Sequence, residues 1–125
     1  MALYENLPIY KVSYELLMQV YRLCSNMERT YRYTLGERVQ KELTELMLNI
    51  YRANSTREKV EHIRKARENV VVVRLLFRVA HDSKQIGLKM FVVISEQIES
   101  ISKQLTAWEK STMKRICPDE AHPDE

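Results

Sequence analysis

The chain has 125 residues, of which 30% are charged and 45% hydrophobic, a composition typical of a globular protein rather than of a disordered one. This length fits one domain and can bury a hydrophobic core without disulfides or metal ions. Only 2 glycines and 3 prolines occur, so the sequence has few turn-forming residues and favours long helices.

The charge is distributed unevenly along the chain. Residues 117–125 hold four acidic residues and neither Lys nor Arg, which leaves 20 basic and 13 acidic groups in residues 1–116. We expect residues 1–116 to form one basic folded domain, and a basic domain attracts polyanions. We expect residues 117–125, which lack hydrophobic periodicity, to be a disordered acidic tail.

Targeting and redox features point to the cytoplasm. The N-terminal segment MALYENLPIYK lacks the basic and apolar regions of a signal peptide, and no stretch approaches the roughly 20 apolar residues of a membrane span. Cys24 and Cys117 are isolated, which suits a reducing compartment and argues against a zinc site or a disulfide framework. We therefore expect a cytoplasmic protein that does not contact a membrane.

Two apolar rows predict a first helix over residues 8–28, with Pro8 suited to its first turn. One row is Ile9, Val12, Leu16, Val20, Leu23 and Met27, and the other is Tyr10, Tyr14, Leu17, Tyr21 and Cys24. Such a wide apolar face predicts contacts with more than one neighbouring helix. We expect Tyr10, Tyr14, Tyr21 and Tyr51 to pack at helix seams, with their hydroxyl groups at the boundary.

A second helix is expected over residues 35–53, with Thr34 as its N-cap and Glu37 as the capping-box partner. Its apolar residues follow a regular 4-3-4-3 spacing: Val39, Leu43, Leu46, Ile50 and Ala53. The segment ANST then breaks the pattern. Ser55 and Glu58 form a second capping-box pattern that predicts the start of a third helix.

The third helix is expected over residues 56–80 and contains four consecutive valines, Val70 to Val73. A half-buried strand would show alternation, whereas the apolar row keeps one helical register on both sides of the valines. That row is Ile63, Ala66, Val70, Val73, Phe77 and Ala80. The valines are therefore predicted to lie in a helix interior.

The fourth helix is expected over residues 85–110, with the apolar row Gly87, Phe91, Ile94, Ile98, Ile101, Leu105 and Trp108. Four such helices joined by short loops predict an all-α, antiparallel up-and-down four-helix bundle. Further apolar residues lie outside the rows: Leu75, Leu76, Val79, Met90, Val92 and Val93. We expect them to support self-association, with a thicker core as the alternative.

Arginines on the third helix form the main candidate binding site. They follow steps of seven, three and four residues and so share one face: Arg57, Arg64, Arg67, Arg74 and Arg78. We expect Arg74 and Arg78 not to be neutralised within their own helix, so that the stripe can bind phosphates of RNA or DNA. The alternative is that glutamates of the second or fourth helix pair with these arginines across the bundle.

A second basic group precedes and opens the second helix: Arg29, Arg32 and Arg38, with Tyr31 and Tyr33 between them. Stacking of bases on the two tyrosines would extend a nucleic-acid surface. The alternative is a solvated loop whose tyrosines close the end of the bundle.

The sequence gives little support for catalysis. A di-iron bundle needs Glu three residues before His on two helices, but Lys59, Arg78 and Asp119 precede the three histidines. We therefore expect no metal, no cofactor and no catalytic residue. Arg57–His62 and Arg74–His81 fit the Arg-x4-6-His spacing of bundle ribonucleases, but about one such match is expected by chance. Leu75 also stands where a polar residue is usual in those enzymes.

Two segments resemble a known family over about residues 7–111. The first contains LGERVQKEL, which opens the second helix, and the second contains SKQLTAWEKS, which closes the fourth. Both are similar to the bacterial four-helix-bundle family that includes the accessory variability determinants of diversity-generating retroelements. A sister group is encoded in intervening sequences of ribosomal RNA genes.

The resemblance implies a homopentameric, barrel-like assembly with a basic surface and no catalytic residue. It also implies association with a reverse transcriptase and its template RNA, in support of mutagenic complementary-DNA synthesis. On this chain, the resemblance assigns the basic surface to the arginines of the third helix: Arg64, Arg67, Arg74 and Arg78. The alternative functions are a structural or RNA-associated protein of the intervening-sequence type, without a polymerase partner, and the bundle ribonuclease.

Overall fold

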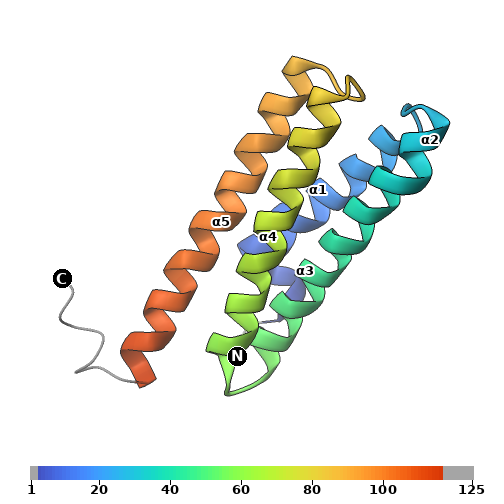
Figure 1. The fold of residues 1–125 in the computed structure, drawn as a ribbon. Helices are drawn as coiled ribbons and strands as arrows, with labels where there is room; N and C mark the ends of the chain where they lie inside the picture. Colours follow the sequence, from blue (N-terminus) through green and yellow to red (C-terminus); the bar gives the residue numbers. More distant parts are fainter. Residues whose placement is uncertain (1–2, 117–125) are drawn as a thin grey trace.

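The computed structural model describes residues 3–116, and every regular element in this range is helical. Four long helices run alternately up and down (Figure 1): α1 Pro8–Cys24, α3 Glu37–Ser55, α4 Lys59–Asp82 and α5 Leu88–Ile116. The turn η1 (Tyr4–Asn6) precedes α1, while α2 (Arg29–Tyr31) and η2 (Arg32–Gly36) join α1 to α3. The predicted antiparallel four-helix bundle is confirmed. The predicted acidic tail, 117–125, lies outside the described residues.

Helix α4 packs between α3 and α5, and α1 contacts both α3 and α5 on the other side of the bundle. The predicted contact of the first helix with more than one neighbour is therefore confirmed. The core forms from the predicted apolar rows, since Leu16, Leu43, Ile63 and Leu105 have no exposed surface. Burying side chains of this size stabilises the fold by about 1.5–3 kcal/mol each before entropy is counted.

The four valines of α4 lie in a helix, as predicted. Val70 and Val73 are buried in the core, 4% and 1% exposed, whereas Val71 is 63% exposed. This separation has the helical period rather than the alternation of a strand. The β-branched residues reduce helix propensity slightly, and the burial of two of them offsets this cost.

The helix boundaries differ from the predicted ones by a few residues. Helix α1 ends at Cys24 rather than near residue 28, and α4 covers Lys59–Asp82 rather than 56–80. Helix α5 begins at Leu88, so Gly87 lies before it and is exposed. It continues beyond residue 110 to Ile116, and Thr112 in this extension is buried.

The first predicted capping box, Thr34 with Glu37, is wrong. Thr34 lies inside the π-helical turn η2, and its Oγ1 donates a hydrogen bond to the carbonyl oxygen of Thr30 at 2.7 Å. The helical backbone already continues through this turn into α3, so no free N-terminus is left to cap. Gly36 permits close packing here, because a Cβ atom at this position would lie 2.9 Å from the Sγ of Cys24.

The second predicted capping box, Ser55 with Glu58, is also wrong. Ser55 is the last residue of α3, and its Oγ donates to the carbonyl oxygen of Tyr51 at 2.9 Å. Thr56 instead accepts a hydrogen bond from the backbone N–H of Glu58 in the turn before α4. Lys59 secures the end of α3 by donating to the carbonyl oxygen of Ala53.

Tyr4 of η1 connects the N-terminal segment to α1 and α3. The Tyr4 hydroxyl donates to the carbonyl oxygen of Met47 in α3 at 2.7 Å, and its ring packs edge-on against Tyr10 and Tyr51. Burial, followed by the charge of Tyr10, raises the pKa of Tyr4 to about 12. Tyr14 and Tyr51 remain about half exposed, so they border the α1–α3 seam rather than fill it.

Candidate nucleic-acid interface

The predicted arginine stripe lies on or just before α4, and all five side chains are exposed: Arg57, Arg64, Arg67, Arg74 and Arg78. The expectation that neither Arg74 nor Arg78 is neutralised within its own helix is wrong for Arg78 and holds for Arg74, which pairs with another helix instead. Arg74 Nη2 lies 3.2 Å from Glu99 Oε1 of α5. Arg78 Nε lies 3.2 Å from Asp82 Oδ2, four residues further along α4. Both acids are about as exposed as the arginines that they meet.

Arg64 and Arg67 share one carboxylate. Arg64 Nε donates to Glu109 Oε2 at 2.8 Å, and Arg67 Nη1 donates to Glu109 Oε1 at 2.6 Å. The alternative considered from the sequence, pairing with glutamates of the fourth helix, therefore holds for three arginines of the stripe. Only Glu109 serves two of them, so this cluster keeps one positive charge in excess.

The Glu109 side chain is only 13% exposed, whereas those of Arg64 and Arg67 are 59% and 46% exposed. Burial raises the pKa of the Glu109 carboxyl, but the hydrogen bonds and charges of Arg64 and Arg67 together outweigh it. The pKa therefore lies below its ordinary value, and the carboxylate stays ionised at neutral pH. The two guanidinium groups lie outside it, toward solvent.

These residues border a groove of about 460 Å³ between α4 and α5. Val70, Val71, Ser102 and Leu105 contribute to its lining. Charged side chains complete the lining, with Arg64, Arg67, Glu68 and Arg74 from α4 and Glu109 from α5. The groove thus combines an apolar surface with three arginines.

Lysines of α5 add a second row of exposed positive charge, which the sequence analysis missed. Lys103, Lys110 and Lys114 are exposed, and none forms an ion pair with another residue of 3–116. Lys103 and Lys110 directly follow the groove residues Ser102 and Glu109, so they lie on a different face of α5, and Lys103 borders a separate hollow with Glu96 and Glu99. Their spacing of seven and then four residues places the three lysines on one face of α5. That spacing could have revealed them in the sequence.

The opposite seam of α4, with α3, contains a closed polar network. Asn49 and Asn69 are buried, and the amide of Asn49 donates to the side-chain oxygen of Asn69 at 2.8 Å. Asn69 in turn donates to Glu42, and Arg52 donates to Asn49. Ion pairs with Arg38 and Glu45 complete the network at its two ends. Each of the two buried amides therefore has partners for both its oxygen and its nitrogen.

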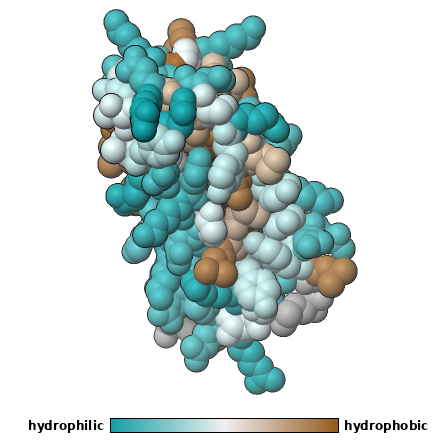
Figure 2. Space-filling model, turned by 90° about the vertical axis from the view of Figure 1, so that its right-hand side faces the viewer, coloured by the Kyte–Doolittle hydropathy of each residue, from teal (hydrophilic) through white to brown (hydrophobic). Residues whose placement is uncertain are grey.

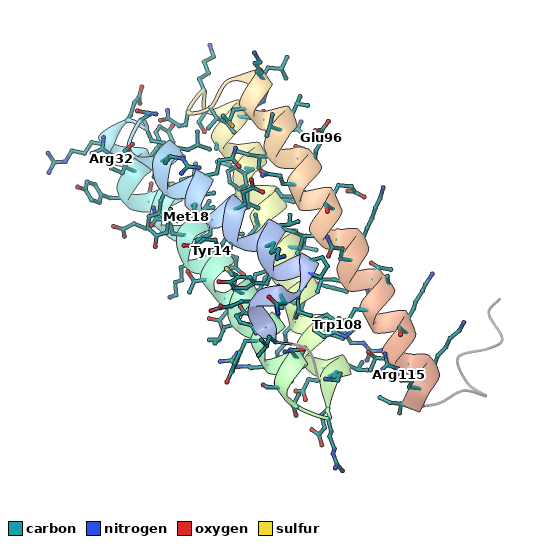
Figure 3. All side chains as sticks on the ribbon, turned by 180° about the vertical axis from the view of Figure 1, so that it is seen from behind. Tyr14, Met18, Arg32, Glu96, Trp108 and Arg115 are labelled. Atoms are coloured by element: carbon teal, nitrogen blue, oxygen red, sulfur yellow. The ribbon has the colours of Figure 1, made fainter. Side chains whose placement is uncertain are left out.

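The second predicted basic group does not join the α4 stripe. Figure 3 places Arg32 at one end of the bundle and Arg115 of α5 at the other. Arg32 is half-buried and donates to the carbonyl oxygens of Ser25 and Met27 at the end of α1. Arg29 lies over the ring of Tyr33, 5.9 Å from its centroid. These contacts resemble the alternative of a bundle end closed by tyrosines.

One of the two Arg-His pairs that fit the ribonuclease spacing, Arg74 with His81, is divided between two hollows. Arg74 borders the α4–α5 groove, whereas His81 borders a separate hollow at the α4–α5 turn and stacks on Phe91. Within residues 3–116, no three His, Cys, Asp or Glu side chains cluster as metal ligands do. No helix in this range is both long and apolar enough to span a membrane.

Apolar side chains remain exposed on two faces. Val71 and Leu75 of α4 are 63% and 60% exposed, and Val92 of α5 is 46% exposed. On the side of α1 and α3, Figure 2 shows brown and pale residues between teal margins. Tyr14 and Met18 extend from α1 on this side (Figure 3). Exposed apolar residues grouped on one face are suited to contacts with another protein surface.

Comparison with known proteins places the chain in a family. The sequence profile of the bAvd-like family matches residues 8–112, which include all four long helices up to Thr112. No curated protein matches the chain. The matched range contains the α4–α5 groove with Arg64, Arg67 and Glu109. The chain therefore belongs to the bAvd-like family, the accessory variability determinants of diversity-generating retroelements.

Proposed function

We propose that the chain is a non-enzymatic accessory protein of a diversity-generating retroelement. In this role it binds the reverse transcriptase and its template RNA or complementary DNA through a basic surface, and it supports mutagenic reverse transcription. The family match over residues 8–112 supports the accessory role. The single observation that supports nucleic-acid binding is the excess of cations around the α4–α5 groove.

The walls of the groove carry more basic than acidic groups. The basic groups that line it are Arg64, Arg67 and Arg74, and the acidic groups that line it are Glu68 and Glu109. A surface of this kind binds phosphates largely without regard to sequence, and its affinity falls as salt rises. The groove therefore suits the backbone of RNA or DNA.

We also propose that the protein acts as a homo-oligomer, a pentamer as the family resemblance implies. Exposed apolar residues outside the groove support this proposal, Leu75 and Val92 on α4–α5 and Tyr14 and Met18 on α1, because self-association would remove them from water. Two different faces suit a head-to-tail contact, which closes into a ring when the rotation between copies allows it. The tyrosine-bearing face is suited to an interface because its aromatic residues bury much area.

The proposal is tested by co-purification of the tagged chain with the reverse transcriptase and template RNA of one retroelement. We expect the polymerase to be retained, with RNA binding that weakens as salt is raised. Retention of RNA without the polymerase would instead favour the intervening-sequence type of protein. Retention of neither would contradict the proposed function.

A further inference from the structure

The three-residue cluster of Arg64, Arg67 and Glu109 differs from an ordinary surface ion pair. Its carboxylate is 13% exposed and lies beneath guanidinium groups that are 59% and 46% exposed. The acid therefore faces the protein while the cations face solvent. Arg64 and Arg67 are three residues apart on α4 and so project from the same face.

Each arginine uses one nitrogen for the carboxylate and keeps the others for a ligand. Arg64 donates through Nε, which leaves both terminal NH₂ groups, and Arg67 donates through Nη1, which leaves Nη2 and Nε. A guanidinium has five N–H donors in a rigid fork, which matches phosphate oxygens in pairs. Fixing one nitrogen of each arginine reduces the side-chain freedom that binding would otherwise cost.

Other acid–arginine contacts near α4 lack this combination. Glu99 meets Arg74 alone, and both side chains are about half exposed, 57% and 51%. Glu42 is 16% exposed but meets only Arg38, at 3.6 Å, and the neutral amide of Asn69. In both cases one acid balances one arginine, whereas Glu109 leaves a net positive charge at the edge of the groove.

We propose that Arg64 and Arg67 form a clamp for one phosphate of the nucleic-acid backbone, and that Glu109 is the positioning residue that holds it. This assignment rests on the proposed nucleic-acid binding and names the site within it. The phosphate lies at the α4–α5 groove, which Arg64, Arg67 and Arg74 line. Glu109 does not touch the phosphate and acts only through the two arginines.

For the variant Glu109→Gln, the clamp predicts a change in RNA affinity opposite in sign to the change that net charge alone predicts. Replacing Glu109 by Gln removes a negative charge, so attraction between net charges alone would tighten RNA binding. With a clamp, the same change replaces one of the two acceptor oxygens by an NH₂ group and releases an arginine. We therefore expect Glu109→Gln to weaken binding on the order of fivefold, the size of one ordinary hydrogen bond.

The test measures the affinity of a fluorescently labelled RNA hairpin, at fixed salt, for the full chain and for two single variants. Glu99→Gln is the matched control, because it makes the same charge change on the same helix and frees only Arg74. We expect Glu99→Gln to bind equally or more tightly and Glu109→Gln to bind more weakly. Circular dichroism and a thermal melt establish that each variant is folded.

If both variants bind RNA as tightly as the native chain, or more tightly, the clamp is overturned while the proposed function stands. If the native chain itself does not bind RNA, the nucleic-acid function and the clamp both fail. Should Glu109→Gln not fold, the double variant Arg64→Lys, Arg67→Lys decides the matter. It keeps the charge but loses the forks, so the clamp predicts weaker binding and electrostatics alone predicts no change.

A DNA hairpin of the same sequence identifies the group that is bound. The clamp contacts phosphate, so Glu109→Gln is expected to weaken DNA and RNA binding by similar factors. Weakening for RNA alone would overturn the assignment to phosphate, because the two backbones share that group and differ at the 2′-hydroxyl.

Discussion

The two seams of α4 both contain polar groups, but they use them in different ways. Toward α3, Asn49 and Asn69 bond to each other and to flanking side chains, so no amide group is left over. Toward α5, Glu109 serves two arginines that keep free donors at the surface. A closed polar network fixes how two helices pack, whereas one with surplus donors is available to a ligand.

The largest expected effect is on stability and comes from removing hydrogen bonds of the α3–α4 polar network. Asn69→Ala removes a partner from both Asn49 and Glu42, and we expect it to lower the free energy of unfolding by about 2–4 kcal/mol. Urea denaturation followed by circular dichroism measures the change. Glu61→Gln, which affects only an exposed ion pair with Lys65 outside the network, is the control and should cost less than about 0.5 kcal/mol. Equal effects of the two variants would contradict a structural role for the network.

Removing the groove arginines should lower RNA affinity more than it lowers stability. We expect the double variant Arg64→Gln, Arg67→Gln to lose about tenfold in RNA affinity, because charge-assisted bonds to phosphate disappear. Its free energy of unfolding should fall by only about 1 kcal/mol, the cost of leaving a mostly buried carboxylate without those partners. Fluorescence anisotropy and urea denaturation on the same samples separate the two effects. Unchanged RNA affinity would mean that RNA does not bind at the groove.

Acid should weaken the α4–α5 seam through Glu109. Its pKa is lower in the folded protein than the ordinary value of 4.5, so its contribution to stability is complete above that pH. The contribution is lost as pH falls below 4.5 and through the folded-state pKa. We expect the free energy of unfolding to fall less steeply with acid in Glu109→Gln than in the native chain. Urea denaturation at several pH values measures this dependence. The same dependence of the free energy of unfolding on pH in the variant and in the native chain would contradict the expectation.

The smallest effect is expected at Arg78. Its ion pair with Asp82 is formed by side chains that are 69% and 61% exposed, so solvent screens most of the attraction. Arg78→Gln should change the free energy of unfolding by less than about 0.5 kcal/mol. A larger loss in urea denaturation would mean that exposed pairs hold α4 as firmly as Glu109 does.

The fold could be predicted because its signal is local. The row of α3 repeats at helical spacing, and every member is buried as expected: Val39, Leu43, Leu46, Ile50 and Ala53. The two capping boxes failed for a local reason as well. Thr34 and Ser55 have the residue types of N-caps, but the chain remains helical through both, so their hydroxyls donate to earlier carbonyl oxygens instead.

The site could be predicted only in part. The spacing of Arg64 and Arg67 correctly placed them on one exposed face, since that depends on α4 alone. Their shared partner, Glu109, lies more than 40 residues away, and only the register of α5 against α4 brings it there. The pairing of Arg78 with Asp82 was available from the sequence, because the two residues are four apart on one helix.

The proposed nucleic-acid site is the α4–α5 groove and not the α3 side of the bundle. The salt dependence of RNA affinity tests this for two triple variants, each of which removes three positive charges. The groove variant is Arg64→Gln, Arg67→Gln, Arg74→Gln, and the α3 variant is Arg38→Gln, Lys41→Gln, Arg52→Gln. We predict that the slope of log affinity against log salt falls in magnitude by about two for the groove variant and stays near the native value for the α3 variant. Equal slopes for the two variants, or a larger loss for the α3 variant, would contradict the claim.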